Sequence, residues 1–292
     1  MEKSKIIVWA IWIFLVLSML IYIIYLIRDC IKNKEKIEKD GNNIIIIITA
    51  FFTQFFDTLG IGSFAIMTSV FRGFKLIKDK ILPGTLNTAA TTSVMLQALI
   101  FIKTVEVDTK TLVLMTISAL TGALLMSGVV SKLSEKTIQI IMSITLFILA
   151  LIIISAQLKL TPLGGDATGL YGVKLIIGVI GNFIFGILMT VGIGLYAPCL
   201  ALVYFLGMNP AVAFPIMMCS CAVLMPFASM SFIKNNAYNR KISILFLIPG
   251  AIGVFIAAFI VKSMNIYWIT WLVVVVLIYT SFNLLMTYLR KK

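Results

Sequence analysis

Two short stretches, one in each half of the chain, decide how it folds: Thr58–Ala65 reads TLGIGSFA and Thr190–Ala197 reads TVGIGLYA. Each stretch lies inside a long apolar run and places two glycines where an unbroken helix would be expected. Glycine costs about 1 kcal/mol in a helix interior, so each pair marks a place where the helix either breaks or packs closely against another helix. Only the first stretch follows an acid, Asp57, because the matching position in the second is Met189.

The composition places these stretches in a membrane. Of the 292 residues, 61% are hydrophobic and 12% are charged, whereas a soluble domain carries about 25% charged residues. Apolar runs of about 20 residues recur, as expected for several transmembrane helices. They fall near 6–27, 44–71, 81–102, 111–130, 137–157, 174–206, 211–233, 242–261 and 266–289. We therefore expect an all-α, polytopic protein of the inner cell membrane, with the lipid bilayer as a partner.

The charged residues indicate membrane topology and argue against a nucleic-acid partner. The net charge is +13, but Lys and Arg cluster between the apolar runs and form no long basic face. Basic loops are the usual topology signal of membrane proteins. Histidine is absent, which excludes histidine acid–base chemistry and His-ligated metals. We expect neither an enzyme nor a bound cofactor.

The second half of the chain repeats the first. Pro83 and Pro215 keep the spacing of the two glycine motifs, and Ala119–Gly122 (ALTG) matches Gly250–Gly253 (GAIG) at nearly the same spacing. We interpret this as one four-segment unit that has been duplicated. The predicted parts are an N-terminal transmembrane helix with a cytoplasmic linker (1–43), repeat 1 (44–158), a Gly- and Pro-containing loop (159–173) and repeat 2 (174–292). The hydrophilic stretch Arg28–Asn43 is expected to be a mobile linker or a short amphipathic helix.

The first segment of each repeat is too long for a single upright crossing. Residues 44–71 and 174–206 would form straight helices of about 42 and 50 Å, against a hydrocarbon core of about 30 Å. Each segment either folds back as a re-entrant hairpin or crosses once as a tilted helix. The hairpin divides Lys and Arg more sharply between the two sides and is the favoured interpretation. A hairpin followed by three transmembrane helices makes the repeats inverted, as in many secondary transporters, whereas simple crossings make them parallel.

Polar groups near the glycine motifs are the candidate binding residues. A helix that restarts at Ser63 or Leu195 would direct backbone N–H groups into a cavity, where they could bind an anion. On the helix after each motif, hydroxyl, amide and thiol groups gather, although interhelical hydrogen bonding explains them equally well. The candidate substrate-binding residues are Gly60, Gly62, Ser63, Asn87, Thr88, Thr91, Gly192, Gly194, Tyr196, Cys219 and Ser220. We expect the site between the two glycine breaks.

Asp57 and the cysteines allow other chemistry. Asp57 is the only acid inside the apolar segments and is a candidate for proton coupling; the alternative is a helix-end carboxylate that caps backbone near the hairpin turn. A membrane thiol-redox protein could use Cys199, Cys219 and Cys221. The position that matches Cys199 is Met67, so the halves do not each contribute a cysteine, and cysteines also serve as small buried hydrophobes.

Together these features resemble the sulfite exporter TauE/SafE family of membrane permeases. The resemblance is carried by Asp57–Ala65, Asn87-Thr88-Ala89, Gly192–Ala197 and Gly250–Gly253. It covers about Ile44 to the C-terminus and leaves the N-terminal helix outside. It implies secondary transport of a small sulfur-containing anion, such as sulfite, sulfoacetate or another sulfonate, by alternating access coupled to an ion or proton. An anion channel is a further alternative, and a homodimer is one candidate assembly.

Overall fold

The computed structural model describes residues 2–60, 62–78, 81–130, 165–189, 194–263 and 266–290, with scattered positions between 136 and 158. Within these residues the chain is almost entirely helical, and the only β-type pairing is an isolated bridge between Ala167 and Met208. Among them, five helices are long and apolar enough to cross a membrane: Val8–Lys32, Leu82–Lys103, Gly172–Met189, Pro210–Lys234 and Arg240–Ile260. The predicted fold class, an all-α multi-pass membrane protein, is confirmed.

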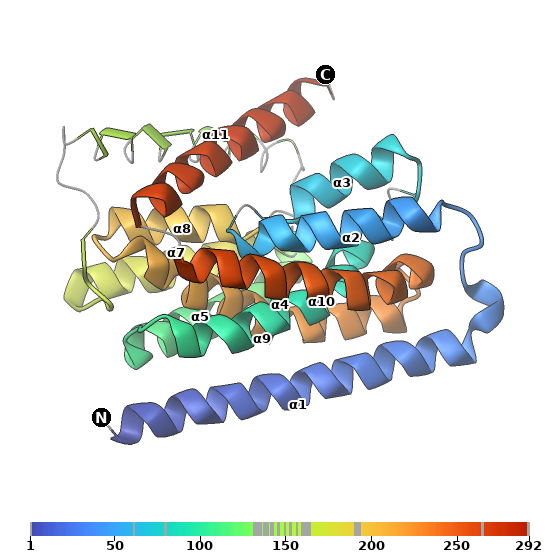
Figure 1. Ribbon diagram of the computed structural model, residues 1–292, viewed down its shortest axis with the longest axis horizontal. Helices are drawn as coiled ribbons and strands as arrows, with labels where there is room; N and C mark the ends of the chain where they lie inside the picture. The colour runs from blue at the N-terminus through green and yellow to red at the C-terminus, as the bar shows by residue number, and fades with distance from the viewer. Residues whose placement is uncertain are drawn as a thin grey trace. The chain divides into compact units, whose positions relative to one another are not determined.

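The helices follow the apolar runs of the sequence, because a backbone in lipid must satisfy its hydrogen bonds within the segment. They are α1 (Glu2–Lys32), α2 (Asn43–Thr58), α3 (Phe64–Gly73), α4 (Leu82–Thr104), α5 (Thr109–Val130), α7 (Gly172–Met189), α8 (Tyr196–Phe205), α9 (Ala213–Lys234), α10 (Arg240–Ser263) and α11 (Ile266–Arg290), with short 3-10 helices η1 (Lys34–Lys36) and η3 (Pro210–Val212) (Figure 1). The predicted run at 137–157 lies mostly outside the described residues.

The first long segment is a helical hairpin. In the turn between α2 and α3, Gly60 and Gly62 have φ angles of 91° and 83°, a conformation that glycine adopts without steric cost. Helix α3 then turns back along α2 (Figure 1), so that Gln54 Nε2 lies 3.8 Å from Met67 Sδ. In one straight helix these residues would be about 20 Å apart along the axis. The break predicted at this glycine motif is therefore present.

The second long segment folds back in the same way. A Cβ added to Gly181 on α7 would lie 2.5 Å from Leu202 Cδ2 on α8, and one added to Gly178 would lie 3.5 Å from Leu206 Cδ1. The earlier glycine on α7 thus contacts the later leucine on α8, which is the pattern of two antiparallel helices. Helices α7 and α8 thus form a second hairpin.

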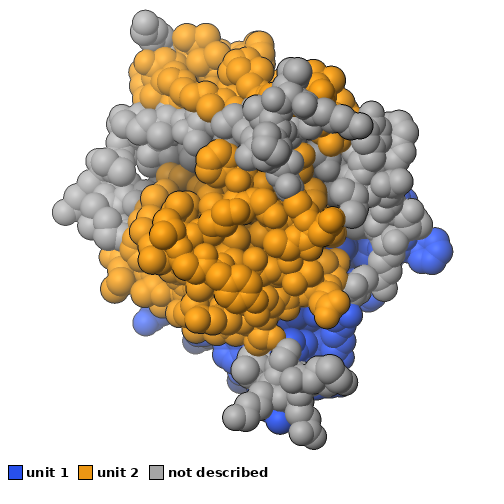
Figure 2. Space-filling view, turned by 90° about the vertical axis from the view of Figure 1, so that its left-hand side faces the viewer, with its two compact units in different colours: residues 1–103, 221–262 blue, residues 104–220, 263–292 orange. Residues whose placement is uncertain are grey.

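The chain divides into two compact units, which Figure 2 shows in different colours. Unit 1 comprises residues 1–103 and 221–262, and unit 2 comprises residues 104–220 and 263–292. Unit 1 contains α1, the α2–α3 hairpin, α4 and nearly all of α10, whereas unit 2 contains α5, the α7–α8 hairpin and α11; α9 contributes to both. Each unit therefore combines elements from both of the predicted repeats.

Each hairpin packs through a glycine on a helix of the other predicted repeat. In unit 1, Gly253 on α10 lies against the backbone of Phe51 on α2; in unit 2, Gly122 on α5 lies against the backbone of Phe183 on α7. In the sequence repeat, Gly253 is the counterpart of Gly122, and Phe183 is the counterpart of Phe51. A side chain at either glycine would collide with a main-chain carbonyl group. The same contact thus occurs twice with its partners exchanged, which supports the duplication.

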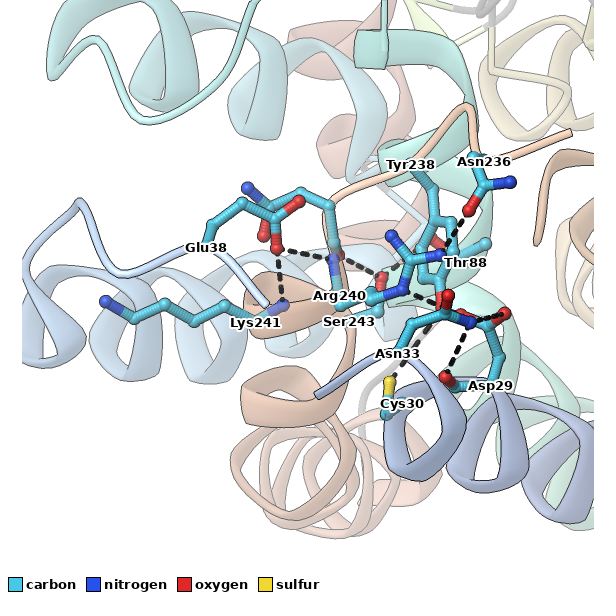
Figure 3. Close-up of polar contacts among 11 residues, drawn as sticks. Asp29, Cys30, Asn33, Glu38, Thr88, Asn236, Tyr238, Arg240, Lys241 and Ser243 are labelled. Carbon is cyan, nitrogen blue, oxygen red and sulfur yellow. Dashed lines mark hydrogen bonds and ion pairs between the residues drawn. The ribbon is translucent and has the colours of Figure 1, made fainter. Parts of the chain in front are cut away.

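The stretch Arg28–Asn43 comprises the end of α1, the short helix η1 and the residues before α2, and it contacts the start of α10 (Figure 3). Arg240 Nε lies 2.8 Å from Asp29 Oδ2. Glu38 Oε2 accepts the backbone N–H groups of Arg240 and Lys241 at 3.0 and 3.2 Å. The Lys241 ammonium donates to three backbone carbonyl groups of the stretch. The N-terminal helix α1 is therefore anchored to the body of unit 1.

Candidate functional site

Asp57 holds the chain at the point where the first hairpin turns. Its side chain is buried. Oδ1 accepts the backbone N–H of Ser63, which precedes α3, at 2.5 Å, and Oδ2 accepts from Gln97 Nε2 on α4 at 3.0 Å. Both oxygens are acceptors from N–H donors, as suits an ionised carboxylate. Asp57, at the end of α2, thus accepts a backbone N–H at the hairpin turn, which was the alternative to proton coupling.

The candidate hydroxyls on α4 already contact other helices of unit 1. Thr88 Oγ1 lies 2.7 Å from Ser243 Oγ on α10, and Thr91 Oγ1 lies 2.8 Å from Ser229 Oγ on α9. Asn87 Nδ2 donates at 2.9 Å to a carbonyl one turn earlier in its own helix. Interhelical hydrogen bonds of this kind average about 0.6 kcal/mol in membrane proteins. The structural interpretation of these polar residues therefore has direct support in the geometry.

Three buried polar side chains in unit 1 were missed by the sequence reasoning: Gln54, Ser93 and Gln97. Gln54 and Ser93 are both 0% exposed, and Gln54 Oε1 and Ser93 Oγ have no hydrogen-bond partner among the described residues. A buried polar group left unpaired costs about 1–3 kcal/mol. Both side chains lie against α10, where a Cβ added to Gly250 would be 2.5 Å from Ser93 Oγ and 3.2 Å from Gln54 Cγ.

Helical spacing was the signal that could have found these residues. Gln54 and Asp57 are three apart on α2, and Ser93 and Gln97 are four apart on α4, so each pair shares a helix face. The Gln97–Asp57 hydrogen bond joins the two faces. We call these four residues the Asp57 cluster: it contains one carboxylate, two amides and one hydroxyl.

The start of α8 in unit 2 differs from the start of α3. Leu195 precedes the helix and supplies no side-chain cap, and Met189 occupies the position of the acid. No described atom lies within 4 Å of the place that a Cβ would take on Gly194. Tyr196, the first residue of α8, is buried. Gly192 lies outside the described residues. The second hairpin therefore offers a helix start with open space beside it.

Unit 2 also has a buried amide that contacts a candidate residue. Asn182 Nδ2 on α7 lies 2.9 Å from Ser220 Oγ on α9 and 2.7 Å from the Met115 carbonyl on α5. Its Oδ1 has no hydrogen-bond partner among the described residues. The sequence reasoning missed Asn182, although it is the one amide in the apolar run of α7. Cys219, beside Ser220 on α9, is fully buried. Asn182 thus joins α5, α7 and α9, and Ser220 is one of its partners.

Within each unit, the candidate residues gather at a hairpin turn and on the helix that follows. Unit 1 places Gly60, Gly62 and Ser63 at the turn and Asn87, Thr88 and Thr91 on α4; unit 2 places Gly194 and Tyr196 at the start of α8 and Cys219 and Ser220 on α9. Among the described residues, no group of three or more His, Cys, Asp or Glu side chains could hold a metal ion. All four cysteines are buried, and they form no disulfide.

Helices that break inside apolar segments, with polar groups buried at the breaks, occur in many secondary transporters. The chain belongs to the sulfite exporter TauE/SafE family, whose model matches residues 4–153 and 174–292. Members of this family are transporters rather than enzymes, and their substrates are small sulfur-containing anions. No curated protein and no solved structure matches the chain. Because the family match begins at residue 4, the expectation that the N-terminal helix lies outside it is wrong.

Proposed function

We propose that the protein is a secondary transporter of the inner cell membrane for a small sulfur-containing anion such as sulfite, sulfoacetate or another sulfonate. The match to the TauE/SafE family along most of the chain carries this proposal. The broken helices support it, because helix ends inside a membrane protein provide binding groups near the bilayer midplane. Transport proceeds by alternating access, in which the substrate site opens to one side of the membrane at a time.

The start of α8 suits the anion better than the start of α3. The positive end of a helix dipole and its first N–H groups attract an anion without any basic side chain. At α3, the Asp57 carboxylate already accepts the Ser63 N–H and would repel a second negative group. At α8, methionine replaces the acid; the Cβ positions of Gly194 and of its counterpart Gly62 are both open, so the acid is the difference between the two helix starts. We therefore assign the anion to the backbone at Gly194–Tyr196.

Uptake of radiolabelled sulfite and sulfoacetate into proteoliposomes tests this assignment. Gly194→Leu fills the open space beside the start of α8, so we expect the apparent affinity to fall by about tenfold or more, equivalent to about 1.4 kcal/mol. Gly73→Leu is the matched control, because Gly73 also has no described atom near its Cβ position but lies exposed at the end of α3. Wild-type uptake by a correctly folded Gly194→Leu protein would rule out this site. Asn87→Leu, measured in parallel, tests the α4 candidates.

Two measurements separate this proposal from other classes of protein. A transporter saturates with rising substrate concentration, whereas a channel conducts without saturation, so linear uptake would favour the channel. A thiol-redox protein needs its cysteines. We expect the triple variant Cys199→Ser, Cys219→Ser and Cys221→Ser to retain transport if it folds. Loss of transport in the folded triple variant would favour redox chemistry instead.

A further inference from the structure

We propose that the Asp57 cluster binds a monovalent cation of about sodium's size, and that this cation is the coupling ion of transport. Cation binding is argued from the geometry of unit 1 alone. Its coupling to an anion rests on the proposed function. Neither the family match nor the sequence repeat assigns Gln54, Ser93 or Gln97 any part in binding.

The two unpartnered oxygens are the first argument. Gln54 Oε1 on α2 and Ser93 Oγ on α4 lie in fully buried side chains against the same glycine of α10, Gly250. On the same stretch of chain, the hydroxyls of Thr85, Thr88 and Thr91 donate to carbonyl groups one turn earlier, whereas Thr92 Oγ1 also has no partner among the described residues. Buried polar groups in proteins nearly always have a partner, so two exceptions on side chains that contact the same glycine call for a ligand.

The charge of the cluster selects a cation. A ligand beside Gln54 and Ser93 lies near the Asp57 carboxylate, which attracts a positive ion and repels a negative one strongly where the dielectric is low. Amide, hydroxyl and carboxylate oxygens are the ligands that hard cations prefer. One carboxylate balances one positive charge. A Cβ added to Gly250 would lie 2.5 Å from Ser93 Oγ; because the packing there is this close, we assign the smaller of the two common monovalent ions, Na⁺ rather than K⁺.

A proton on Asp57 would explain less. Protonation would give neither Gln54 Oε1 nor Ser93 Oγ a partner. Both Asp57 oxygens already accept from N–H donors, at Ser63 and Gln97, and an added O–H would face one of those donors. The arrangement thus favours a bound cation, rather than a proton, as the partner of the Asp57 carboxylate.

Neutralisation of Asp57 allows coupling to the anion. In a coupled transporter, the anion binds the cation-loaded protein more tightly than the cation-free protein. By thermodynamic linkage, the anion raises the affinity for the cation by the same factor. A protein of this kind moves the two ions together.

Cation binding is tested without any substrate anion. The melting temperature of the purified protein is measured while NaCl replaces choline chloride at constant ionic strength, and again with KCl. Because a ligand that binds only the folded state stabilises it, we expect a saturable rise with Na⁺ that KCl does not produce. Identical melting curves in all three salts would overturn the proposal.

Variants locate the ion. Ser93→Ala and Gln54→Met each remove one oxygen with little change in volume, so the Na⁺ concentration for half-saturation should rise by about tenfold or more. Ser229→Ala is the matched control, because Ser229 is an equally buried serine whose hydroxyl contacts Thr91 instead. If the Na⁺ concentration for half-saturation is unchanged in both cluster variants, Na⁺ does not bind at the Asp57 cluster, even if the wild type binds Na⁺ elsewhere.

Proteoliposomes separate this proposal from the proposed function. We expect an inward Na⁺ gradient to drive sulfite or sulfoacetate uptake, and a protonophore to leave that uptake unchanged. If anion uptake does not depend on the Na⁺ gradient but is driven by a proton gradient, the proposed Na⁺ coupling is wrong and the transporter function still stands. Saturable Na⁺ binding in a protein that transports neither anion would instead contradict the proposed substrates and leave the cation site standing.

Discussion

Glycines serve two different purposes in this chain. Gly62 has a φ of 83°, and no described atom lies within 4 Å of its Cβ position. Gly253 lies within helix α10, but a Cβ there would collide with the carbonyl group of Phe51. The first glycine is needed for its backbone conformation and the second for its small size. The two requirements predict different costs for the same substitution.

We expect Gly253→Ala to lower the free energy of unfolding by about 1–3 kcal/mol, because an added atom in close packing forces a backbone shift. Gly62→Ala should cost about 1–2 kcal/mol through its left-handed conformation alone. Gly73→Ala is the control: its Cβ position is open and its φ is not positive. Denaturation in mixed micelles measures all three. Equal stability of Gly253→Ala and Gly73→Ala would contradict the close packing of α10 on α2.

At the scale of an element, helix α1 depends on a polar cluster at the start of α10 (Figure 3). The side chains of Arg240 and Asp29 are 4% and 17% exposed, and they form an ion pair. Tyr238 donates to the same Asp29 oxygen at 2.7 Å, and Arg240 Nη2 lies 2.5 Å from Asn236 Oδ1. The cluster is nearly closed to water, so each of its charges relies on its partner.

Asp29→Asn should lower the free energy of unfolding by about 3 kcal/mol, because Arg240 is then buried without a counter-charge. Replacing both residues, as Asp29→Leu with Arg240→Met, should recover most of that loss. Lys241→Ala removes an exposed contact and should cost at most about 1 kcal/mol. A double-mutant cycle in which the two single losses simply add would show that Asp29 and Arg240 do not act as a pair.

Tyr238 gives the same cluster a pH dependence. Burial, and then the hydrogen bond to Asp29, raise the pKa of Tyr238 above its ordinary value of 10.0. The folded state thus holds the phenol proton more tightly than the unfolded state. The resulting stability is fully present below pH 10 and is lost as the pH rises further. We expect wild type to be more stable than Tyr238→Phe at pH 8, and the difference in melting temperature to shrink above pH 10. A constant difference would contradict this.

At the scale of the whole molecule, the two compact units do not coincide with the two predicted repeats. In each unit, the hairpin of one repeat packs against a helix of the other repeat, as the contacts of Gly253 with Phe51 and of Gly122 with Phe183 show. The α2–α3 hairpin also brings its two ends together, since a Cβ on Gly41 would lie 3.3 Å from Leu76 Cδ2. The loops before α2 and after α3 should therefore face the same side of the membrane.

Cysteine labelling in intact cells and inverted vesicles tests that topology. Lys34 and Lys75 are exposed, and the four native cysteines are buried, so the background should be low. We expect Lys34→Cys and Lys75→Cys to react with a membrane-impermeant maleimide from the same side. Reaction from opposite sides would mean that residues 44–71 cross the membrane once. The inverted relation of the repeats stays a prediction until a result of this kind is obtained.

Properties that depend on a short stretch of chain could be predicted from the sequence. The apolar runs indicated the helices because lipid leaves the backbone no other hydrogen-bond partners. Gly60 and Gly62 indicated the break because their conformation is a local requirement. The repeat motifs and the class of protein followed from residue spacing and composition. The sequence did not predict that the family match would include the N-terminal helix, because α1 carries none of the repeat motifs.

Only the tertiary structure decided which polar side chains are available for binding. Thr88, Thr91 and Ser93 all look alike in the sequence of α4, yet the first two face serines on α10 and α9, and Ser93 has no partner among the described residues. The sequence therefore determined the membrane class, the helices and their breaks. The structure determined the Asp57 cluster, since a hydroxyl's partner lies on a helix from a distant part of the chain and no local pattern records it.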